Sequence, residues 1–437
     1  MHDPGGRIEF DQTSVVRHHY VPLPDTHFLR TANARHLVDT GALVNFKIAD
    51  DSTTVSPRIP FVTYPGEWTN AQLLDAGRLT LAISDQILPA GFELKDASAW
   101  NVLFDGTQPI FCDHLSFQPV ALSQWRAFGQ FVRHFLLPLC LTRIKNIDAR
   151  TAFLLNQDGL PPDQARALFG VGRFFTRYWP LMLARSDSTA KRQNKEKRTP
   201  DLRRYHRNLY ALSGWLLESL SHRSTSQSHW VSYAGERKHY NSEASNVKRA
   251  TVANWLTELA PAWVADAGCN TGEFTLLAHA AGACVIAIDQ DHDSIQSLYI
   301  SHRSERRIFP VVASLADLSG GRGWCGKEFP GLLTRMEQLA DMVMMLALIH
   351  HLAISHAVPY EEIADLAKVL TKRYLVLEFI GEDDALVAHL CAQRQRRPEE
   401  FSLDRQRAAF SKQFRIVKEV RLPGTCRSVA LLERHQR

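Results

Sequence analysis

The stretch WVADAGCNTGEF, residues 263–274, decides the fold of the C-terminal half of the chain. Its apolar start predicts a short buried strand that ends in Asp266. Gly268 and Gly272 then allow a sharp turn into a helix. Glycine is needed in such a turn because a ligand can approach the main chain only where no Cβ intervenes. The stretch therefore predicts a strand, a ligand-binding turn and a helix.

The next strand, within VIAIDQD, ends in Asp289, where an acid is placed to bind ribose hydroxyls. The pattern D-x-G-x-N-x-G differs from the dinucleotide fingerprint G-x-G-x-x-G, because Asn270 stands at the position of its second glycine. Asp266 would repel a pyrophosphate, but it suits the cationic amino group of a methionine-like moiety. The pattern therefore argues against a dinucleotide.

Apolar runs alternate with helix-like segments through the rest of this half. Strands are expected at Trp263–Ala267, 284–288, 308–313, 342–347 and 374–379, and helices at Glu273–Ala280, 293–301 and Tyr360–Leu370. This alternation predicts a parallel sheet covered on both faces. Strands expected at 414–422 and 427–432 are joined by a Pro-Gly turn without room for a helix, so they should pair antiparallel at one edge.

The form DAGCNTGEF resembles the first motif of class I S-adenosylmethionine-dependent methyltransferases. The resemblance implies a Rossmann-like α/β fold with a seven-stranded sheet and an antiparallel final hairpin, and S-adenosylmethionine as cofactor. It implies that Asp266 and the glycine loop hold the methionine part and Asp289 the ribose. Asp317 would lie near adenine, or would simply cap a helix. The residues expected to bind the cofactor are Asp266, Gly268, Cys269, Asn270, Gly272, Asp289, Gln290, Asp317 and Leu346.

Candidate catalytic residues follow the fourth and fifth strands. The fourth runs into LALIHHL, residues 346–352, at the edge where ligands bind in open α/β sheets. His350 or His351 is a candidate general base because imidazole titrates near neutrality; alternatively, the rings fill the pocket wall or bond to backbone. Glu378, in LVLEF, either binds substrate or pairs with a histidine. An insertion around Trp324 forms a lid, an acceptor wall or a surface elaboration.

The N-terminal half carries a second pattern. In ELKDASAWNVLFDGTQPIFCDHLSF, Asp96 stands five residues before Asn101, and Asp113 ends a later strand. This resembles the catalytic loop and metal-binding strand of kinase-like phosphotransferases, in which the first Asp orients a hydroxyl while Asn and the later Asp hold magnesium. A helix-like stretch at 70–88 precedes the pattern. No glycine-rich phosphate loop is visible, and His114 follows Asp113 where phenylalanine is usual, so a reduced α+β kinase-like domain is expected.

A shift in composition separates the two halves. Residues 184–207 hold nine Lys or Arg against three acids and almost nothing apolar. Such a segment is either a solvated loop or helix face, or a docking surface for an anionic substrate. The expected division is a kinase-like or substrate-recognition domain at 1–183, a basic linker with connecting helices at 184–246, and a class I methyltransferase domain at 247–437.

Bulk composition excludes several classes. The chain of 437 residues is 45% hydrophobic with a net charge of only +5, as in an ordinary globular protein. Its seven cysteines are scattered and form no CxxC pair, which argues against a zinc site or a disulfide framework and for the cytoplasm. No apolar run is long enough to span a bilayer, so no membrane partner is expected.

Together, YPGEW at 64–68, LKDASAWNVLF and DAGCNTGEF resemble a family of bacterial two-domain methyltransferase-like proteins, some of them labelled as related to nodulation proteins. The expected function is methyl transfer to an oxygen or nitrogen of a small-molecule or glycan-type natural product. One alternative is an RNA or protein methyltransferase that uses the basic segment 191–207, although no RNA-binding signature supports nucleic acid. Another is a bifunctional or nucleotide-sensing protein. The sequence leaves the oligomeric state open.

Overall fold

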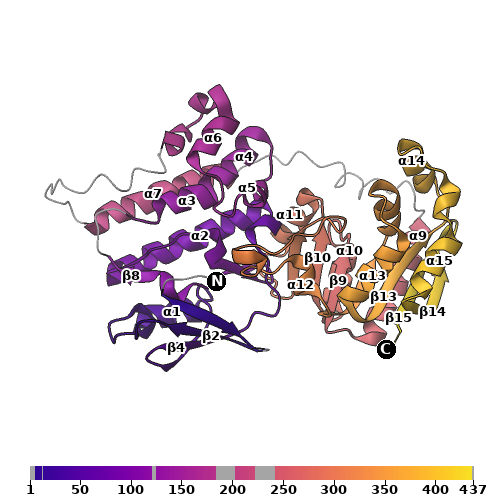
Figure 1. Cartoon of the computed structure of the whole chain (residues 1–437), viewed down its shortest axis with the longest axis horizontal. Helices are drawn as coiled ribbons and strands as arrows, with labels where there is room; N and C mark the ends of the chain where they lie inside the picture. Colours follow the sequence, from indigo (N-terminus) through magenta and orange to yellow (C-terminus); the bar gives the residue numbers. More distant parts are fainter. Residues whose placement is uncertain (1–4, 12, 121–124, 184–201, 222–241, 436–437) are drawn as a thin grey trace. The chain divides into compact units, whose positions relative to one another are not determined.

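The computed structural model describes residues 5–11, 13–120, 125–183, 202–221 and 242–435 (Figure 1). The chain divides into two compact units. The N-terminal unit comprises Met1–Ser224 and the segment Arg322–Phe329, and the C-terminal unit comprises Thr225–Gly321 and Pro330–Arg437.

The C-terminal unit contains a seven-stranded sheet with the order β11-β10-β9-β12-β13-β15-β14. Its strands are β9 (Trp263–Ala267), β10 (Cys284–Asp289), β11 (Ile308–Val312), β12 (Ala340–Met345), β13 (Thr371–Ile380), β14 (Phe414–Arg421) and β15 (Arg427–Arg434). Neighbours from β11 to β13 pair parallel, whereas β15 pairs antiparallel with both β13 and β14. The predicted parallel sheet and antiparallel final pair are confirmed. The last strand in sequence lies inside the sheet, and β14 forms the edge.

Helices connect these strands. They are α9 (Ser242–Leu259), α10 (Glu273–Ala280), α11 (His292–Ser301), α12 (Leu332–Met336), α13 (Tyr360–Leu370), α14 (Ala385–Gln393) and α15 (Leu403–Ser411). Val285, Met342, Val376 and Leu431, from four different strands, are buried in one core cluster with Leu256 of α9. These strands read as continuous apolar runs because helices cover the sheet and leave little of it in water.

A tight turn joins β9 to α10 and lies over the end of β10. The backbone N–H groups of Gly268 and Cys269 both donate to the carbonyl oxygen of Ile288, at 2.8 and 3.0 Å. Gly268 and Gly272 have φ values of 77° and 91°, in the left-handed region that residues with a Cβ rarely adopt. A Cβ at Gly272 would also lie 2.6 Å from Cδ1 of Leu298. The shape of the turn therefore requires both glycines.

The N-terminal unit begins with a four-stranded antiparallel sheet in the order β1-β2-β4-β3. Two antiparallel ribbons follow, β5 with β8 and β6 with β7. The strands are β1 (Gly6–Phe10), β2 (Ser14–His19), β3 (Lys47–Asp50), β4 (Thr53–Pro57), β5 (Phe92–Leu94), β6 (Val102–Asp105), β7 (Gln108–Phe111) and β8 (Phe117–Pro119). Like the C-terminal unit, this unit mixes helices and strands.

The helix expected at 70–88 is α2 (Asn70–Ile87). A capping box fixes its start, since the Gln72 N–H donates to Thr69 Oγ1 at 3.2 Å and the Thr69 N–H donates to Gln72 Oε1 at 2.9 Å. α7 (Leu202–Ser221) runs beside α2, and a Cβ at Gly77 would meet Leu217 at 3.2 Å (Figure 1). The other helices are α1 (Ala32–Asp39), α3 (Phe128–Phe131), α4 (Leu137–Lys145), α5 (Arg150–Leu155) and α6 (Pro162–Phe169).

The segment Arg322–Phe329 belongs to the N-terminal unit although it lies between β11 and α12 in the sequence. Phe329 is buried, and its ring centroid lies 4.3 Å from that of Trp100 and 5.4 Å from that of Tyr64. Trp100 and Tyr64 come from the LKDASAWNVLF and YPGEW motifs. The insertion expected as a lid, acceptor wall or surface elaboration is thus anchored by aromatic packing in the N-terminal unit.

Replacing Gly272 with alanine should lower the free energy of unfolding by about 2–4 kcal/mol, because the new Cβ meets both an unfavourable φ and the Leu298 side chain. Urea unfolding followed by circular dichroism measures the change. Gly320→Ala is the matched control, since Gly320 lies in the same unit and its Cβ position has no atom within 4 Å. Equal midpoints for the two variants would show that the turn tolerates a side chain.

Candidate active site

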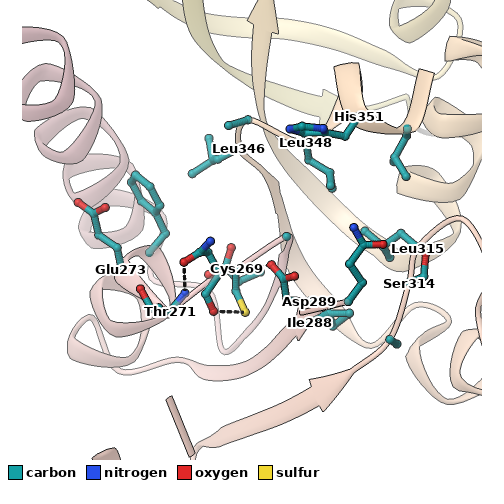
Figure 2. A pocket seen from close by; sticks show the side chains of 18 of the residues that line it. Cys269, Thr271, Glu273, Ile288, Asp289, Ser314, Leu315, Leu346, Leu348 and His351 are labelled. Atoms are coloured by element: carbon teal, nitrogen blue, oxygen red, sulfur yellow. Dashed lines mark hydrogen bonds between the residues drawn. The ribbon is translucent and has the colours of Figure 1, made fainter. Parts of the chain in front are cut away.

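A pocket opens at the carboxyl ends of β9, β10 and β12 in the C-terminal unit (Figure 2). Among the residues expected to bind the cofactor, those that line it are Asp266, Gly268, Cys269, Asn270, Asp289, Gln290 and Leu346. Figure 2 shows Leu346, Leu348 and His351 on the wall opposite Cys269 and Thr271. Parallel strands end at the same edge of a sheet, which brings these residues together from distant parts of the sequence.

Asp266, near the end of β9, is buried beside the pocket. Its Oδ2 accepts a hydrogen bond from the Thr275 hydroxyl at 2.6 Å. Burial raises the pKa of Asp266 to about 6, and the neighbouring Asp289 adds to this increase, whereas the Thr275 bond and Lys248 oppose it. A cation placed against this carboxylate would favour its ionised form. Asp266 is therefore suited to bind an ammonium group.

Asp289, at the end of β10, holds the glycine loop in place. Its Oδ2 accepts the backbone N–H of Asn270 at 2.8 Å, and its Oδ1 accepts that of Asp291 at 2.9 Å. Burial raises the pKa of Asp289 above its usual value, and these two bonds oppose the increase. Each carboxylate oxygen has a second lone pair, so Asp289 can also accept hydrogen bonds from hydroxyls in the pocket.

Sequence analysis missed two cations that line the pocket, Lys248 of α9 and Arg427 of β15. Lys248 Nζ donates to Glu378 Oε2 at 2.6 Å and lies 5.1 Å from the Phe274 ring centroid. Arg427 donates through Nε and Nη2 to Asp384, at 2.7 and 3.0 Å, and through Nη1 to Glu378 at 3.4 Å. Alternating charges thus form a buried chain beside the pocket.

No sequence signal pointed to this chain, because its members are far apart in the sequence. Lys248 and Glu378 are 130 positions apart, and Arg427 and Glu378 are 49 apart. A lysine in a polar helix such as α9 is usually solvated. Only the fold shows that Lys248 is 6% exposed and paired.

The position of Glu378 differs from the sequence prediction, in which this residue binds substrate or pairs with a histidine. It is fully buried, does not line the pocket, and accepts hydrogen bonds from Lys248 and Arg427. A carboxylate held by two cations cannot readily serve as a substrate ligand. Its position makes it a group that fixes the two lining cations.

The two adjacent histidines have different positions. His351 lines the pocket, whereas His350 is buried outside the lining, with ring centroids 4.2 Å apart. Burial lowers the pKa of His351 to about 4, with a further contribution from Arg427. Burial also lowers the pKa of His350 well below its usual value, and neither of its ring nitrogens has a hydrogen-bond partner among the described residues. Both rings are neutral at pH 7, and His351 alone of the two faces the pocket.

Two residues expected at the cofactor, Asp317 and Gly272, do not line the pocket. Asp317 is exposed, and its backbone N–H donates to the Ser314 carbonyl at 3.1 Å. Ser314 and Leu315, closer to the end of β11, line the pocket in its place. Gly272 does not line the pocket either, because its contribution is the shape of the turn.

In the N-terminal unit, the fold brings two residues of the kinase-like pattern close together. Asn101 Nδ2 donates to Ser116 Oγ at 3.2 Å, and the same hydroxyl donates to Asp113 Oδ2 at 2.8 Å. Asp96 is half-buried in the loop that follows β5.

Several classes of site are not found among the described residues. No cluster of three or more His, Cys, Asp or Glu side chains there has an arrangement that could hold a metal. All seven cysteines are free. Within the described part of the chain, no helix has both the length and the apolar character that crossing a bilayer requires.

Comparison with known proteins gives one relative along nearly the whole chain. No family model matches the sequence. The nodulation protein NoeA of Rhizobium meliloti (strain 1021) is 29% identical over 99% of this chain and 95% of its own length.

Three solved structures each resemble less than half of the chain. Magnesium protoporphyrin IX methyltransferase (ChlM) from Synechocystis PCC 6803 with bound SAH is 17% identical over 44% of this chain and 84% of its own, with a TM-score of 0.33. The N-methyltransferase NodS from Bradyrhizobium japonicum WM9 is 10% identical over 45% of this chain and 99% of its own, with a TM-score of 0.34. The bifunctional kinase-methyltransferase WbdD is 16% identical over 44% of this chain and 39% of its own, with a TM-score of 0.32.

The C-terminal unit has the features that its sequence motif implied. It has the seven-stranded sheet with an antiparallel final pair that the DAGCNTGEF motif implied. A left-handed glycine turn follows the first strand, and acids near the ends of the first two strands, Asp266 and Asp289, line one pocket. The C-terminal unit therefore has the fold and the pocket that the resemblance to class I S-adenosylmethionine-dependent methyltransferases implied.

Proposed function

We propose that this chain transfers the methyl group of S-adenosylmethionine to an oxygen or nitrogen of a small-molecule or glycan-type acceptor. The observation that carries the proposal is the neutral imidazole of His351 on the pocket wall, opposite the glycine loop (Figure 2). A neutral ring nitrogen at that place can accept the proton that an acceptor loses on methylation.

The pocket residues fit the cofactor. Asp266 would bind the amino group of its methionine part, and the turn at Gly268 leaves the main chain open to close approach. Asp289 would bind the ribose hydroxyls, and Ser314 and Leu315 would lie beside the adenine. When bound, the cofactor supplies a methyl group on a positively charged sulfur.

Lys248 would bind the carboxylate of the methionine part. Its ammonium lines the pocket and lies close enough to Asp266 to lower the pKa of that residue. Glu378 fixes the Lys248 side chain through a bond of 2.6 Å. A zwitterionic amino acid is recognised by one anion and one cation side by side, and Asp266 and Lys248 provide them.

His351 would act as the general base. A hydroxyl becomes strongly acidic as its oxygen bonds to the methyl carbon, so an imidazole with a pKa of about 4 is basic enough to accept the proton. Arg427 helps to keep this imidazole neutral. The neutral imidazole therefore supports a hydroxyl acceptor.

The acceptor side of the pocket supports a small uncharged molecule. Leu348, Leu352 and Leu386 line it together with His356, a mainly apolar wall with few polar groups that is typical of small-molecule sites. The alternative with RNA or protein as acceptor depends on the basic segment 191–207, which lies largely outside the described residues and stays a prediction. The seven free cysteines support a cytoplasmic location.

We further propose that the N-terminal unit is a reduced kinase-like domain that recognises the acceptor. Asn101 precedes the antiparallel ribbon of β6 and β7 and Asp113 follows it, and both side chains bond to the Ser116 hydroxyl, which supports this resemblance. Nucleotide sensing or phosphotransfer is the alternative, and phosphotransfer requires a metal site that the inference below addresses.

Isothermal titration tests the two halves of the cofactor site separately. Asp289→Ala should weaken the binding of both S-adenosylhomocysteine and 5′-methylthioadenosine by about 10- to 100-fold, because both ligands carry the ribose hydroxyls. Lys248→Gln, which keeps a donor for Glu378, should weaken only S-adenosylhomocysteine, because 5′-methylthioadenosine lacks the amino-acid part. If Lys248→Gln weakened the binding of both ligands equally, Lys248 would not be the residue that binds the methionine carboxylate. If the folded wild-type protein bound neither ligand, the pocket would not be a cofactor site.

Cofactor affinity should depend on pH through Asp266. Only the ionised carboxylate attracts the ammonium group, and its pKa is about 6. Affinity should therefore stay level above about pH 7 and fall by up to about tenfold per pH unit below about pH 5. Titration calorimetry across this range measures the profile. Asp266→Asn is the control and should bind weakly with a flatter profile; an unchanged profile would rule out Asp266 as the titrating group.

His351→Ala should lower kcat by about 10²- to 10⁴-fold while leaving the Kd for S-adenosylhomocysteine nearly unchanged, because the ring acts on the acceptor. Transfer of a tritiated methyl group to a panel of hydroxylated and aminated glycans measures kcat and identifies the acceptor atom. His356→Ala is the matched control, since His356 also lines the pocket. Similar losses in both variants would argue against a base at position 351.

A further inference from the structure

A buried ion pair joins the first sheet of the N-terminal unit to its kinase-like pattern. Arg17 of β2 donates from Nη1 to Asp113 Oδ1 at 2.9 Å. The side chains of Arg17 and Asp113 are only 11% and 15% exposed. Arg17 Nη2 also donates to the carbonyl oxygen of Cys112 at 3.5 Å. The guanidinium is therefore seated against the end of the strand that carries Asp113.

Other donors occupy the rest of the Asp113 carboxylate. Oδ1 also accepts the backbone N–H of Leu115 at 3.0 Å, and Oδ2 accepts the Ser116 hydroxyl at 2.8 Å. A carboxylate offers about four lone-pair positions, and at least three are engaged here. Little of Asp113 is left for another ligand.

We propose that Arg17 takes the place of the divalent cation that a kinase-like domain would hold at Asp113, so that the N-terminal unit acts without a bound metal. The inference rests on the kinase-like arrangement proposed above. In that arrangement, Asn101 and Asp113 would hold magnesium. Here the carboxylate binds a guanidinium, and the amide of Asn101 donates to Ser116.

The chemistry of the surrounding groups agrees with this assignment. Magnesium prefers several oxygen ligands in near-octahedral geometry. His114, next to Asp113, is buried with Nε2 3.2 Å from the Val44 carbonyl oxygen. Its imidazole offers magnesium no oxygen ligand.

Exchange of the guanidinium for a metal is electrostatically unfavourable. Arginine does not lose its proton in proteins, so this cation is permanent. Two cations at one carboxylate repel each other, and metal entry would require a buried charge pair to break. The proposed role of the N-terminal unit is therefore recognition of the acceptor, and not metal-dependent phosphotransfer.

Thermal unfolding of the full chain with and without magnesium chloride tests the inference. Arg17→Met should lower the Tm by about 10 °C, because it leaves a buried carboxylate unpaired. Magnesium should restore part of this loss in Arg17→Met, and should have no effect on wild type or on the double variant Arg17→Met/Asp113→Asn. Arg30→Met is the matched control, since Arg30 pairs with Asp51, whose side chain is 82% exposed.

Two results would overturn the inference. One is a magnesium-dependent rise in the Tm of wild type that Asp113→Asn removes. The other is a folded Arg17→Met variant that does not respond to magnesium. If Arg17→Met does not fold, a second experiment replaces the thermal-unfolding test. Electron paramagnetic resonance then measures manganese binding to wild type and to Arg17→Lys. Absence of bound manganese in both supports the inference, and manganese bound at Asp113 in either overturns it.

Addition of ATP distinguishes this inference from the kinase-like architecture on which it rests. A Tm shift with ATP that is the same with and without magnesium supports both. If the ATP-induced Tm shift requires magnesium and is lost in Asp113→Asn, the N-terminal unit is kinase-like, but Arg17 does not take the place of the metal. Binding of a ligand to the folded state raises the apparent stability, which makes this readout independent of enzymatic activity.

Discussion

The Ile288 carbonyl oxygen and the Asp289 carboxylate hold the glycine loop of β9 against the end of β10. Ile288 accepts two backbone N–H groups, from Gly268 and Cys269, and Asp289 accepts that of Asn270. These bonds shape the pocket before any ligand enters, so that little order has to be created on binding. The acids beside the pocket, its apolar wall and the direction of α10 all depend on this turn.

A second constraint is the buried chain of charges from Lys248 through Glu378 and Arg427 to Asp384. Buried ions add little net stability, because desolvation offsets most of their attraction. Their value here is positional: Lys248 and Arg427 reach the pocket in fixed orientations, and Arg427 contributes to the neutral state of His351. The charges thus connect α9, β13 and β15 beside the pocket.

The N-terminal unit shows that a motif does not specify the partners of its side chains. The pattern of Asn101 and Asp113 is present, and the fold brings both residues to one hydroxyl. The cation at the carboxylate comes from Arg17, 96 positions away on another sheet. Spacing within a motif specifies where a side chain lies along the chain, but not which partner meets it.

Local pattern was sufficient for the strands and for three of the helices of the C-terminal unit, whereas α9, α12, α14 and α15 were not predicted. The strand Trp263–Ala267 and the helix Glu273–Ala280 have the bounds expected from apolar runs and glycines, because both depend on interactions between near neighbours. Asp266 and Asp289 were also identified from their places at strand ends. Only the tertiary structure decided the partners of Glu378, because the order of strands sets which buried charges meet, and spacing in the sequence does not encode that order.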